Sequence, residues 1–283
     1  MEIKRTGSGE VVRRNWLGEM EYLTFPRLEE TGIVSHLFST RVGGVSKGIF
    51  ASMNLSYTRG DDKAAVDENF VRVARVLGRR TEDFVFSDQT HTTNIKRVTV
   101  KDRGKGLVRE KDYADVDGLI TDEPGIVLST FYADCVPLFF VDTVHRAIGL
   151  SHSGWRGTVS RMGERTLEEM KQAFGTEAKN VTAAIGPSIC GNCYEVDADV
   201  AEQFAAAFEG RTLNDILIEK EDGKYLLDLW RANFYILTQA GVPEEKISVT
   251  DICTCCNPEY LFSHRASKGK RGNLGAFLCL RPT

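Results

Sequence analysis

The chain of 283 residues contains no apolar run that approaches the roughly 20 residues needed to span a membrane. Residues 1–16 are basic but lack the apolar core of a signal peptide, so export is not expected. A formal net charge of −4 gives no reason to expect nucleic acid or an anionic membrane as a partner. The seven cysteines form an odd number, which without an export signal predicts reduced thiols in a cytoplasmic protein.

Histidine is also scarce, with five residues in the chain. Blue and trinuclear copper sites depend mainly on imidazole, so this number argues against a multicopper oxidase. The H-E-x-x-H motif and the H-x-E with P-C-x-x-C pattern of zinc nucleobase deaminases are absent. The loop Ser39–Ser46 has neither a Walker lysine nor a G-x-G-x-x-G frame, which leaves a hairpin turn or a simple anion contact as its interpretation.

The sequence does contain enough apolar residues, 42%, for a buried core. Helical periodicity and break signals predict helices over 64–77, 158–174, 197–208 and 226–240. Strand-like runs occur at 33–39, 95–100, 118–121, 126–132, 138–141, 147–151, 181–185, 247–252 and 274–280. Because strands and helices do not alternate strictly, we expect an α+β fold with mixed sheets flanked by helices. We expect one domain over 1–283, with the first ~20 residues peripheral.

Three residues that can bind a metal lie next to strand-like runs. Cys135 follows one run, His152 follows a second, and His91 precedes a third. Two imidazoles and one thiolate form a zinc-ligand set with a vacant fourth position, which is typical of catalytic zinc. Taken singly, each is more often a buried thiol or a turn histidine, so the prediction depends on their combination.

Next to His152, the segment Gly154–Gly157 is expected to be a turn before a helix that starts at Thr158. Free N–H groups at the helix start, with the guanidinium of Arg156, predict an anion site there. The alternative is a capped turn with a surface arginine.

The remaining cysteines form two short groups, Cys190-Gly-Asn-Cys193 and Cys253-Thr-Cys255-Cys256. They could supply a four-thiolate structural metal site, or they are reduced thiols that lie near one another.

Six short motifs occur in order along the chain: Asp117-Gly-Leu-Ile-Thr121, Ala133-Asp-Cys-Val-Pro137, Ser151-His-Ser-Gly-Trp-Arg-Gly157, Ile185-Gly-Pro187, Tyr194-Glu-Val196 and Cys253-Thr254. Together they resemble the YfiH/YlmD-like proteins, once labelled polyphenol oxidases or laccase-domain proteins and now described as purine nucleoside phosphorylases with adenosine deaminase activity. The resemblance runs from about Ser35 to Leu280, and the second and third motifs are its most specific parts. It implies a single-domain α+β fold.

The resemblance also implies a zinc ion held by His91, Cys135 and His152, with copper as the second choice. The implied substrates are phosphate and the nucleosides adenosine, inosine and S-methyl-5′-thioadenosine. Cys135 and Asp134 are the expected catalytic residues, and Asp88 is the alternative proton donor.

Four further positions match family motifs and are expected to bind substrate or phosphate: Arg41, Asn54, Arg156 and Arg265. The chain also departs from the family pattern. Thr90 stands where valine is common, Ser153 stands where alanine is usual, and Asn273 stands where an arginine is expected. The last departure weakens a phosphate-binding role at position 273.

Two other functions remain open at the level of the sequence. Cys135 activated by His152 would suit a cysteine hydrolase or amidase, which could act on peptidoglycan precursors. Alternatively, the chain is a zinc-stabilised binding protein without catalytic activity. The sequence sets no expectation for the oligomeric state.

Overall fold

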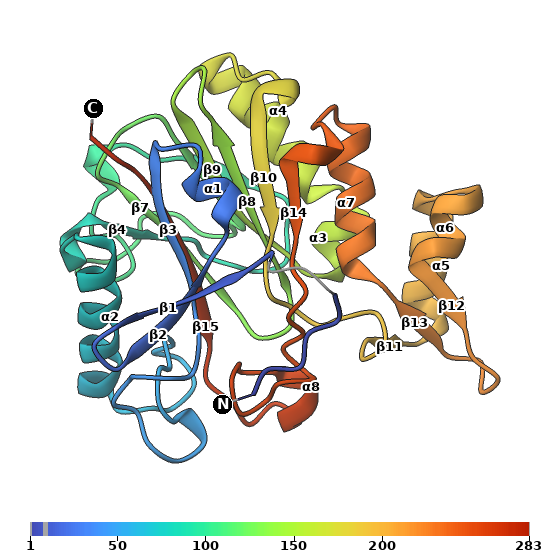
Figure 1. Ribbon diagram of the computed structural model, residues 1–283, viewed down its shortest axis with the longest axis horizontal. Coiled ribbons are helices and arrows are strands. Elements are labelled where there is room, and N and C mark those ends of the chain that lie inside the picture. Colours follow the sequence, from blue (N-terminus) through green and yellow to red (C-terminus); the bar gives the residue numbers. More distant parts are fainter. Residues whose placement is uncertain (1, 8–10, 283) are drawn as a thin grey trace.

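The computed structural model describes residues 2–7 and 11–282; the remaining positions of the expected 1–283 domain lie outside the described residues. Two six-stranded mixed sheets pack face to face, and helices cover their outer faces (Figure 1). This confirms the predicted α+β class with mixed sheets.

The first sheet has its last strand in sequence near its middle. Its strands, in spatial order, are β1 (Arg13–Leu17), β2 (Met20–Thr24), β3 (Val34–Ser39), β15 (Leu274–Leu280), β7 (Val127–Tyr132) and β4 (Phe84–Phe86). β4 pairs with β7 in parallel, and the other neighbours are antiparallel. β15 therefore joins two parts of the chain that are far apart in sequence.

The second sheet carries the candidate metal ligand His152 on one strand, and Cys135 directly precedes another. Its strands, in spatial order, are β14 (Ile247–Val249), β10 (Val181–Ile185), β8 (Val136–Asp142), β9 (Ala147–Ser153), β6 (Gly118–Thr121) and β5 (Ile95–Arg97). A third, antiparallel sheet consists of β11 (Glu195–Val196), β13 (Tyr225–Leu227) and β12 (Leu217–Glu219).

The longer helices lie on the outer faces of the large sheets or beside the small sheet, whereas the four-residue helix Pro26–Glu29 packs against both large sheets. The helices are α1 (Pro26–Glu29), α2 (Lys63–Leu77), α3 (Trp155–Val159), α4 (Met162–Phe174), α5 (Ala198–Ala207), α6 (Gly210–Ile216), α7 (Leu229–Gln239) and α8 (His264–Ser267). α5 and α6 project with the third sheet to the right of Figure 1. Within residues 2–7 and 11–282, no helix combines the length and apolarity needed to cross a membrane.

Alternate residues of the central strands enter different cores. On β8, Phe139 lies in the core between the sheets, whereas Phe140 packs toward α4 and α7. On β15, Leu278 lies between the sheets, and Phe277 packs toward α2. Because both faces are buried, these strands read as continuous apolar runs in the sequence. Full burial of each such side chain contributes about 1.5–3 kcal/mol.

The segment around the third motif differs from its prediction. β9 continues to Ser153 because Ser153 still pairs with Val136 of β8. α3 then begins at Trp155, so the expected turn Gly154–Gly157 is reduced to Gly154 alone. The predicted helix 158–174 is divided into α3 and α4 by Arg161, whose φ of 60° is left-handed.

Other boundaries are also corrected. The predicted helix 226–240 begins only at Leu229, because Tyr225–Leu227 form β13. The predicted strands 95–100 and 247–252 end early, at Arg97 and Val249.

Candidate active site

Three loops and strands bring the predicted metal ligands together. His91 follows β4, Cys135 lies between β7 and β8, and His152 lies within β9. One ligand atom from each residue lies within 4.8 Å of the others, and the two imidazole centroids are 5.1 Å apart. His152 is buried, Cys135 is half-buried and His91 is exposed, so the group opens to solvent on the His91 side.

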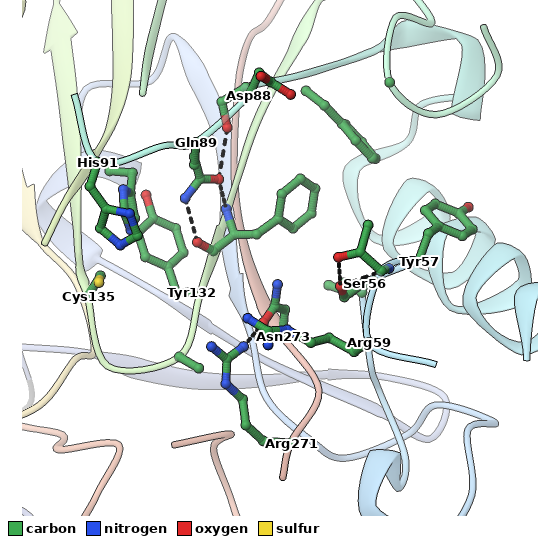
Figure 2. Close-up of a pocket in the computed structure, with 18 of the residues that line it drawn as sticks. Ser56, Tyr57, Arg59, Asp88, Gln89, His91, Tyr132, Cys135, Arg271 and Asn273 are labelled. Atoms are coloured by element: carbon green, nitrogen blue, oxygen red, sulfur yellow. Dashed lines mark hydrogen bonds between the residues drawn. The ribbon is translucent and has the colours of Figure 1, made fainter. Parts of the chain in front are cut away.

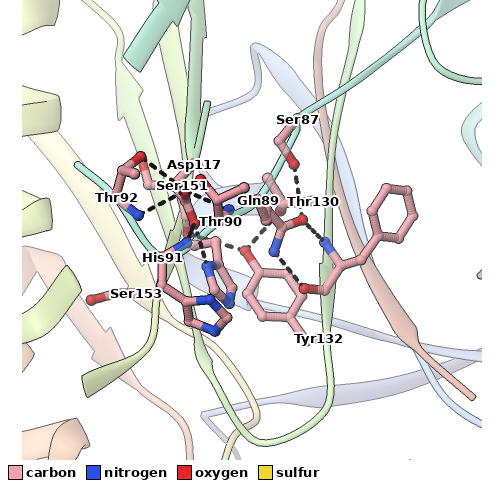
Figure 3. Close-up of polar contacts among 12 residues, drawn as sticks. Ser87, Gln89, Thr90, His91, Thr92, Asp117, Thr130, Tyr132, Ser151 and Ser153 are labelled. Carbon is pink, nitrogen blue, oxygen red and sulfur yellow. Dashed lines mark hydrogen bonds and ion pairs between the residues drawn. The ribbon is translucent and has the colours of Figure 1, made fainter. Parts of the chain in front are cut away.

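Asp117, directly before β6, orients two of these ligands (Figure 3). Its carboxylate accepts from Nδ1 of His152 at 2.8 Å, which leaves Nε2 for the cluster. The same carboxylate accepts the backbone N–H groups of Thr90, His91 and Thr92 at 3.0–3.1 Å. These bonds hold His91 at a φ of 66°, a conformation that is uncommon for a residue with a side chain.

Gln89 ties the His91 loop to the first sheet. Its amide donates to the carbonyl of Phe131 and its oxygen accepts the N–H of Phe131, both at 2.7 Å. Ser87 donates to the same oxygen at 2.9 Å. The loop is therefore fixed to β7 by Gln89 and to β6 by Asp117.

In the metal-free group, Cys135 and His152 favour the ion pair of a thiolate and a protonated imidazole. Burial raises the pKa of Cys135, but the His152 charge and hydrogen bonds from both imidazoles outweigh it and lower that pKa to about 6. Burial likewise opposes protonation of His152, but Cys135 and Asp117 raise the pKa of His152 to about 9. Near neutral pH Cys135 is therefore a thiolate, which is the form that binds metals and attacks electrophiles.

Gly154 leaves room for the ligand group. A Cβ at this position would lie 3.0 Å from Cδ2 of His91 and 3.1 Å from Sγ of Cys135. A side chain at this position would press on both ligands, so the glycine gives the ligand group its present spacing.

The ligand group forms one end of a cavity of about 460 Å³. This volume falls within the range of about 300–1,000 Å³ that is typical of small-molecule sites. Figure 2 shows His91 and Cys135 at one end of the cavity and Tyr57 at the other. Phe131 and Tyr132 contribute aromatic wall between the two ends.

Basic side chains line the same cavity: Arg59, Lys111 and Arg271. Burial, and then the neighbouring Arg59, lower the pKa of Arg271 to about 10. The Nε atom of Arg271 is buried without a hydrogen-bond partner. Lys111 instead pairs with Asp88. In the part of the chain that the structure describes, neither Arg59 nor Arg271 forms an ion pair with a carboxylate. Both are therefore available to an anion.

None of the four predicted substrate-binding residues, Arg41, Asn54, Arg156 and Arg265, lines this cavity. Arg41 donates to the carbonyl of Ala51 at 2.9 Å and covers the ring of Phe262. The exposed Arg156 covers Trp155 with its guanidinium 4.3 Å from the ring centroid. Arg265 donates to the carbonyl of Glu195 at 2.8 Å. These contacts join the guanidinium groups to neighbouring parts of the chain.

Asn54 and Asp134 are buried in hydrogen-bond networks. The Asn54 oxygen accepts the N–H of Asn273 at 2.9 Å, which places Asn54 behind the cavity wall. Both carboxylate oxygens of Asp134 accept hydrogen bonds, from Thr254 Oγ1 at 2.6 Å and from the N–H of Arg265 at 2.7 Å. The alternative proton donor, Asp88, does line the cavity.

The sequence reasoning missed Arg59, Arg271 and Lys111, and it left the role of Asp117 unassigned. Asp117 does begin one of the six quoted motifs. Asp117 directly precedes the predicted strand 118–121. A carboxylate at a strand end was the available signal, because carboxylates commonly orient metal-binding histidines.

Comparison with known proteins places the chain in a family. Residues 35–281 match the family described as multi-copper polyphenol oxidoreductase laccase. The chain belongs to this family. Its relatives and structural neighbours include proteins called YfiH and YlmD, in agreement with the resemblance found in the motifs.

Two relatives in the family are similar over most of their length. Purine nucleoside phosphorylase YlmD of Bacillus subtilis (strain 168) is 37% identical over 246 residues, which cover 86% of this chain and 87% of the relative. Adenosine deaminase RL5, from an unknown prokaryotic organism, is 36% identical over 250 residues, which cover 87% and 93%. The crystal structure of YlmD from Geobacillus stearothermophilus has a TM-score of 0.87 and 34% identity, covering 95% of this chain and 99% of that one.

The family description names copper, whereas the ligand group of this chain suits a different metal. The cluster offers two imidazoles and one thiolate. His36 lies apart, stacked on Phe25, and His145 pairs with Asp142. Among the described residues that line the cavity there is no methionine to act as a weak axial copper ligand. Two imidazoles and a thiolate with an open position fit zinc.

Proposed function

We propose that this chain is a zinc-dependent purine nucleoside enzyme that carries out phosphorolysis of adenosine, inosine and S-methyl-5′-thioadenosine and deamination of adenosine. One observation carries the proposal: a His–Cys–His ligand group and two guanidinium groups that have no carboxylate partner among the described residues line the same aromatic-walled cavity. The names of the family relatives support the substrate class. We further propose that the protein is cytoplasmic.

In this proposal His91, Cys135 and His152 hold the zinc ion. Bound there, zinc would supply Lewis-acid chemistry through the position that the three protein ligands leave open. Asp117 fixes the tautomer and the ring orientation of His152, and it fixes the backbone of His91.

Arg271 and Arg59 are proposed to bind phosphate. A buried cation next to another cation is stabilised when an anion binds between them, and a guanidinium matches phosphate geometry. Arg271 also donates to Asn273, the residue that stands where the family pattern has arginine. Arg271, two residues away, would thus restore the positive charge that Asn273 lacks. Asn54 supports this segment as a positioning residue.

Phosphorolysis forms a bond between a phosphate oxygen and C1′ of the ribose and breaks the bond from C1′ to the purine, which takes up a proton. Deamination replaces the amino group at C6 with oxygen from water and releases ammonia.

Burial raises the pKa of Asp88, but hydrogen bonds from Lys111 and from the N–H of Asp115 outweigh it and lower that pKa. Asp88 is then ionised, so we propose that it accepts a hydrogen bond from the purine.

The direct test is product analysis with purified protein. Adenosine without phosphate should give inosine, and adenosine or inosine with phosphate should give free base and ribose 1-phosphate. Absence of both reactions in the zinc-loaded protein would reject the proposal and favour the non-catalytic zinc protein.

A second candidate function is a cysteine hydrolase or amidase. Cys135, His152 and Asp117 form a hydrogen-bonded nucleophile, base and orienting carboxylate, and the pKa of Cys135 is lowered to about 6. The presence of His91 within the same ligand group favours the metal site, because a nucleophile–base pair needs only one imidazole.

Alkylation of Cys135 by iodoacetamide distinguishes the two functions. In the metal-free protein the rate should rise as pH increases through about 6 and then level off, because the thiolate is the reactive form. A zinc ligand should react slowly until a chelator removes the metal. Fast alkylation that the chelator does not change, with accumulation of a thioester from an amide substrate, would favour the hydrolase.

A further inference from the structure

We propose that Cys190, Cys193, Cys253 and Cys256 form a second, structural zinc site, separate from the cavity. One sulfur atom from each lies within 4.8 Å of the other three. A tetrahedral zinc ion bound to four thiolates at about 2.3 Å would place the sulfurs about 3.8 Å apart. The distance of 3.4 Å between Sγ of Cys193 and Sγ of Cys256 is close to that spacing.

The local backbone resembles a zinc-binding turn at both pairs. Two residues separate Cys190 from Cys193, and two residues also separate Cys253 from Cys256. Cys193 donates its N–H to the carbonyl of Cys190 at 3.0 Å, which closes the first turn. Sγ of Cys253 accepts the backbone N–H groups of Cys190 and Cys256 at 3.3 and 3.4 Å. Such N–H groups stabilise a thiolate.

Hydrogen bonds within the protein hold the two turns together without a metal ion. Thr254 donates its N–H to the carbonyl of Ser188 at 3.1 Å, and Ser188 and Cys253 form a parallel bridge. Trp230 from α7 donates to the hydroxyl of Ser188 at 2.7 Å. The sulfur positions therefore follow from packing, and a metal would bind a largely preformed group.

The arrangement favours a single ion over the alternatives. Iron–sulfur clusters with several irons distribute their cysteine ligands over different metal atoms, which requires sulfurs farther apart than those around one ion. All four cysteines are free thiols in the structure. Four sulfurs fill the coordination of zinc and leave no open position, so the site is structural rather than catalytic.

The proposed zinc site would also support the loop that carries Cys135. Ile189, next to Cys190, donates its N–H to the carbonyl of Asp134 at 3.0 Å. Thr254, next to Cys253, donates its hydroxyl to the carboxylate of Asp134 at 2.6 Å. Asp134 has a φ of 90°, a conformation that costs about 1–3 kcal/mol and needs support from its surroundings. Asp134 is therefore a positioning residue that links the two thiol-containing sites.

The test uses the full-length double variant His91→Ala/His152→Ala, in which the cavity ligands are removed. This protein should retain about one zinc per chain, with four sulfur ligands at about 2.3 Å by X-ray absorption. Adding Cys193→Ser and Cys256→Ser should abolish zinc binding. As a matched control, adding Cys255→Ser, which changes a neighbouring cysteine outside the group, should leave zinc content unchanged.

Cobalt provides a measurement that needs no cysteine variant. Cobalt added to the metal-depleted double variant should give the spectrum of a tetrahedral tetrathiolate complex. The proposal would be overturned if the double variant were isolated without metal and all its cysteines reacted with a thiol reagent. It would also be overturned if the mass of the protein were lower by the hydrogens that are lost when two disulfides form. Stoichiometric iron with its visible absorption would overturn the assignment to zinc. None of these results depends on nucleoside turnover.

Discussion

The two thiol-containing groups differ in their number of ligands and in their access to solvent. The group at His91, Cys135 and His152 has three ligands, two of them imidazoles, and borders a cavity. The group at Cys190 and Cys253 has four sulfurs and is held between two turns. In the proposed assignment, Asp134 lies between a metal group with an open position and one with none. The comparison indicates that the vacant position, rather than the presence of cysteine, marks the reactive site.

Removal of His152 should separate the two groups most clearly. His152→Ala takes away one imidazole and the N–H group that donates to Asp117, so we expect loss of metal from the cavity and loss of all measurable turnover. Elemental analysis should show that zinc falls from about two per chain to about one. His145→Ala, which removes a histidine that also pairs with an aspartate, should change neither value.

Asp117→Asn should weaken only the open group. An asparagine can present its N–H to His152, which would favour the wrong tautomer, and loss of such an orienting carboxylate typically costs about 10–100-fold in metal affinity or activity. Competition with a chelator measures the affinity. Asp142→Asn is the matched control, because Asp142 also bonds Nδ1 of a histidine at 2.8 Å. Equal effects of the two substitutions would assign Asp117 a purely structural role.

Arg271→Ala should leave both metal groups intact and affect phosphate. Loss of a charge-assisted hydrogen bond costs about 1.5–3 kcal/mol, so the KM for phosphate should rise about tenfold or more while adenosine deamination is retained. Arg156→Ala is the informative comparison, because the sequence placed the anion site at that residue. A larger phosphate effect for Arg156→Ala than for Arg271→Ala would move the phosphate site to α3. Arg231→Ala, on the surface of α7, serves as the control.

Gly154→Ala should have the smallest effect. The added methyl group would meet His91 and Cys135 at 3.0–3.1 Å, so the ligands must shift by a few tenths of an ångström. We expect a few-fold loss of zinc affinity at the cavity, on the order of 1 kcal/mol, with the four-cysteine group unaffected. Unchanged affinity would show that His91, which is exposed, can move away without cost.

The sequence predicted the strands that surround the site because most are buried on both faces and form clear apolar runs. It also selected Cys135 and His152, which flank such runs. It could not assign Asp117, because the contact with His152 depends on the pairing of β6 with β9, where Gly118 lies opposite Ser151. Strand register between separate segments is set by tertiary packing rather than by local pattern.

The basic cavity residues were missed for a similar reason. Arg59 follows the segment of Asn54, and Arg271 precedes β15. The two segments are joined by hydrogen bonds from the N–H of Asn273 to Asn54 and from the N–H of Leu55 to Asn273. The break between α3 and α4 was also hidden, because Arg161 is not a residue type that signals a left-handed conformation.

The position of β15 has a consequence for how the protein is made. β3 and β7 leave the ribosome long before residues 274–280, and both must wait for β15 to fill the space between them. Until then two strand edges of the first sheet are unpaired, a state that folds slowly and is prone to aggregation. Arg271 and Asn273 directly precede β15. A partly synthesised chain can therefore contain all three cavity ligands and still lack the wall that completes the cavity.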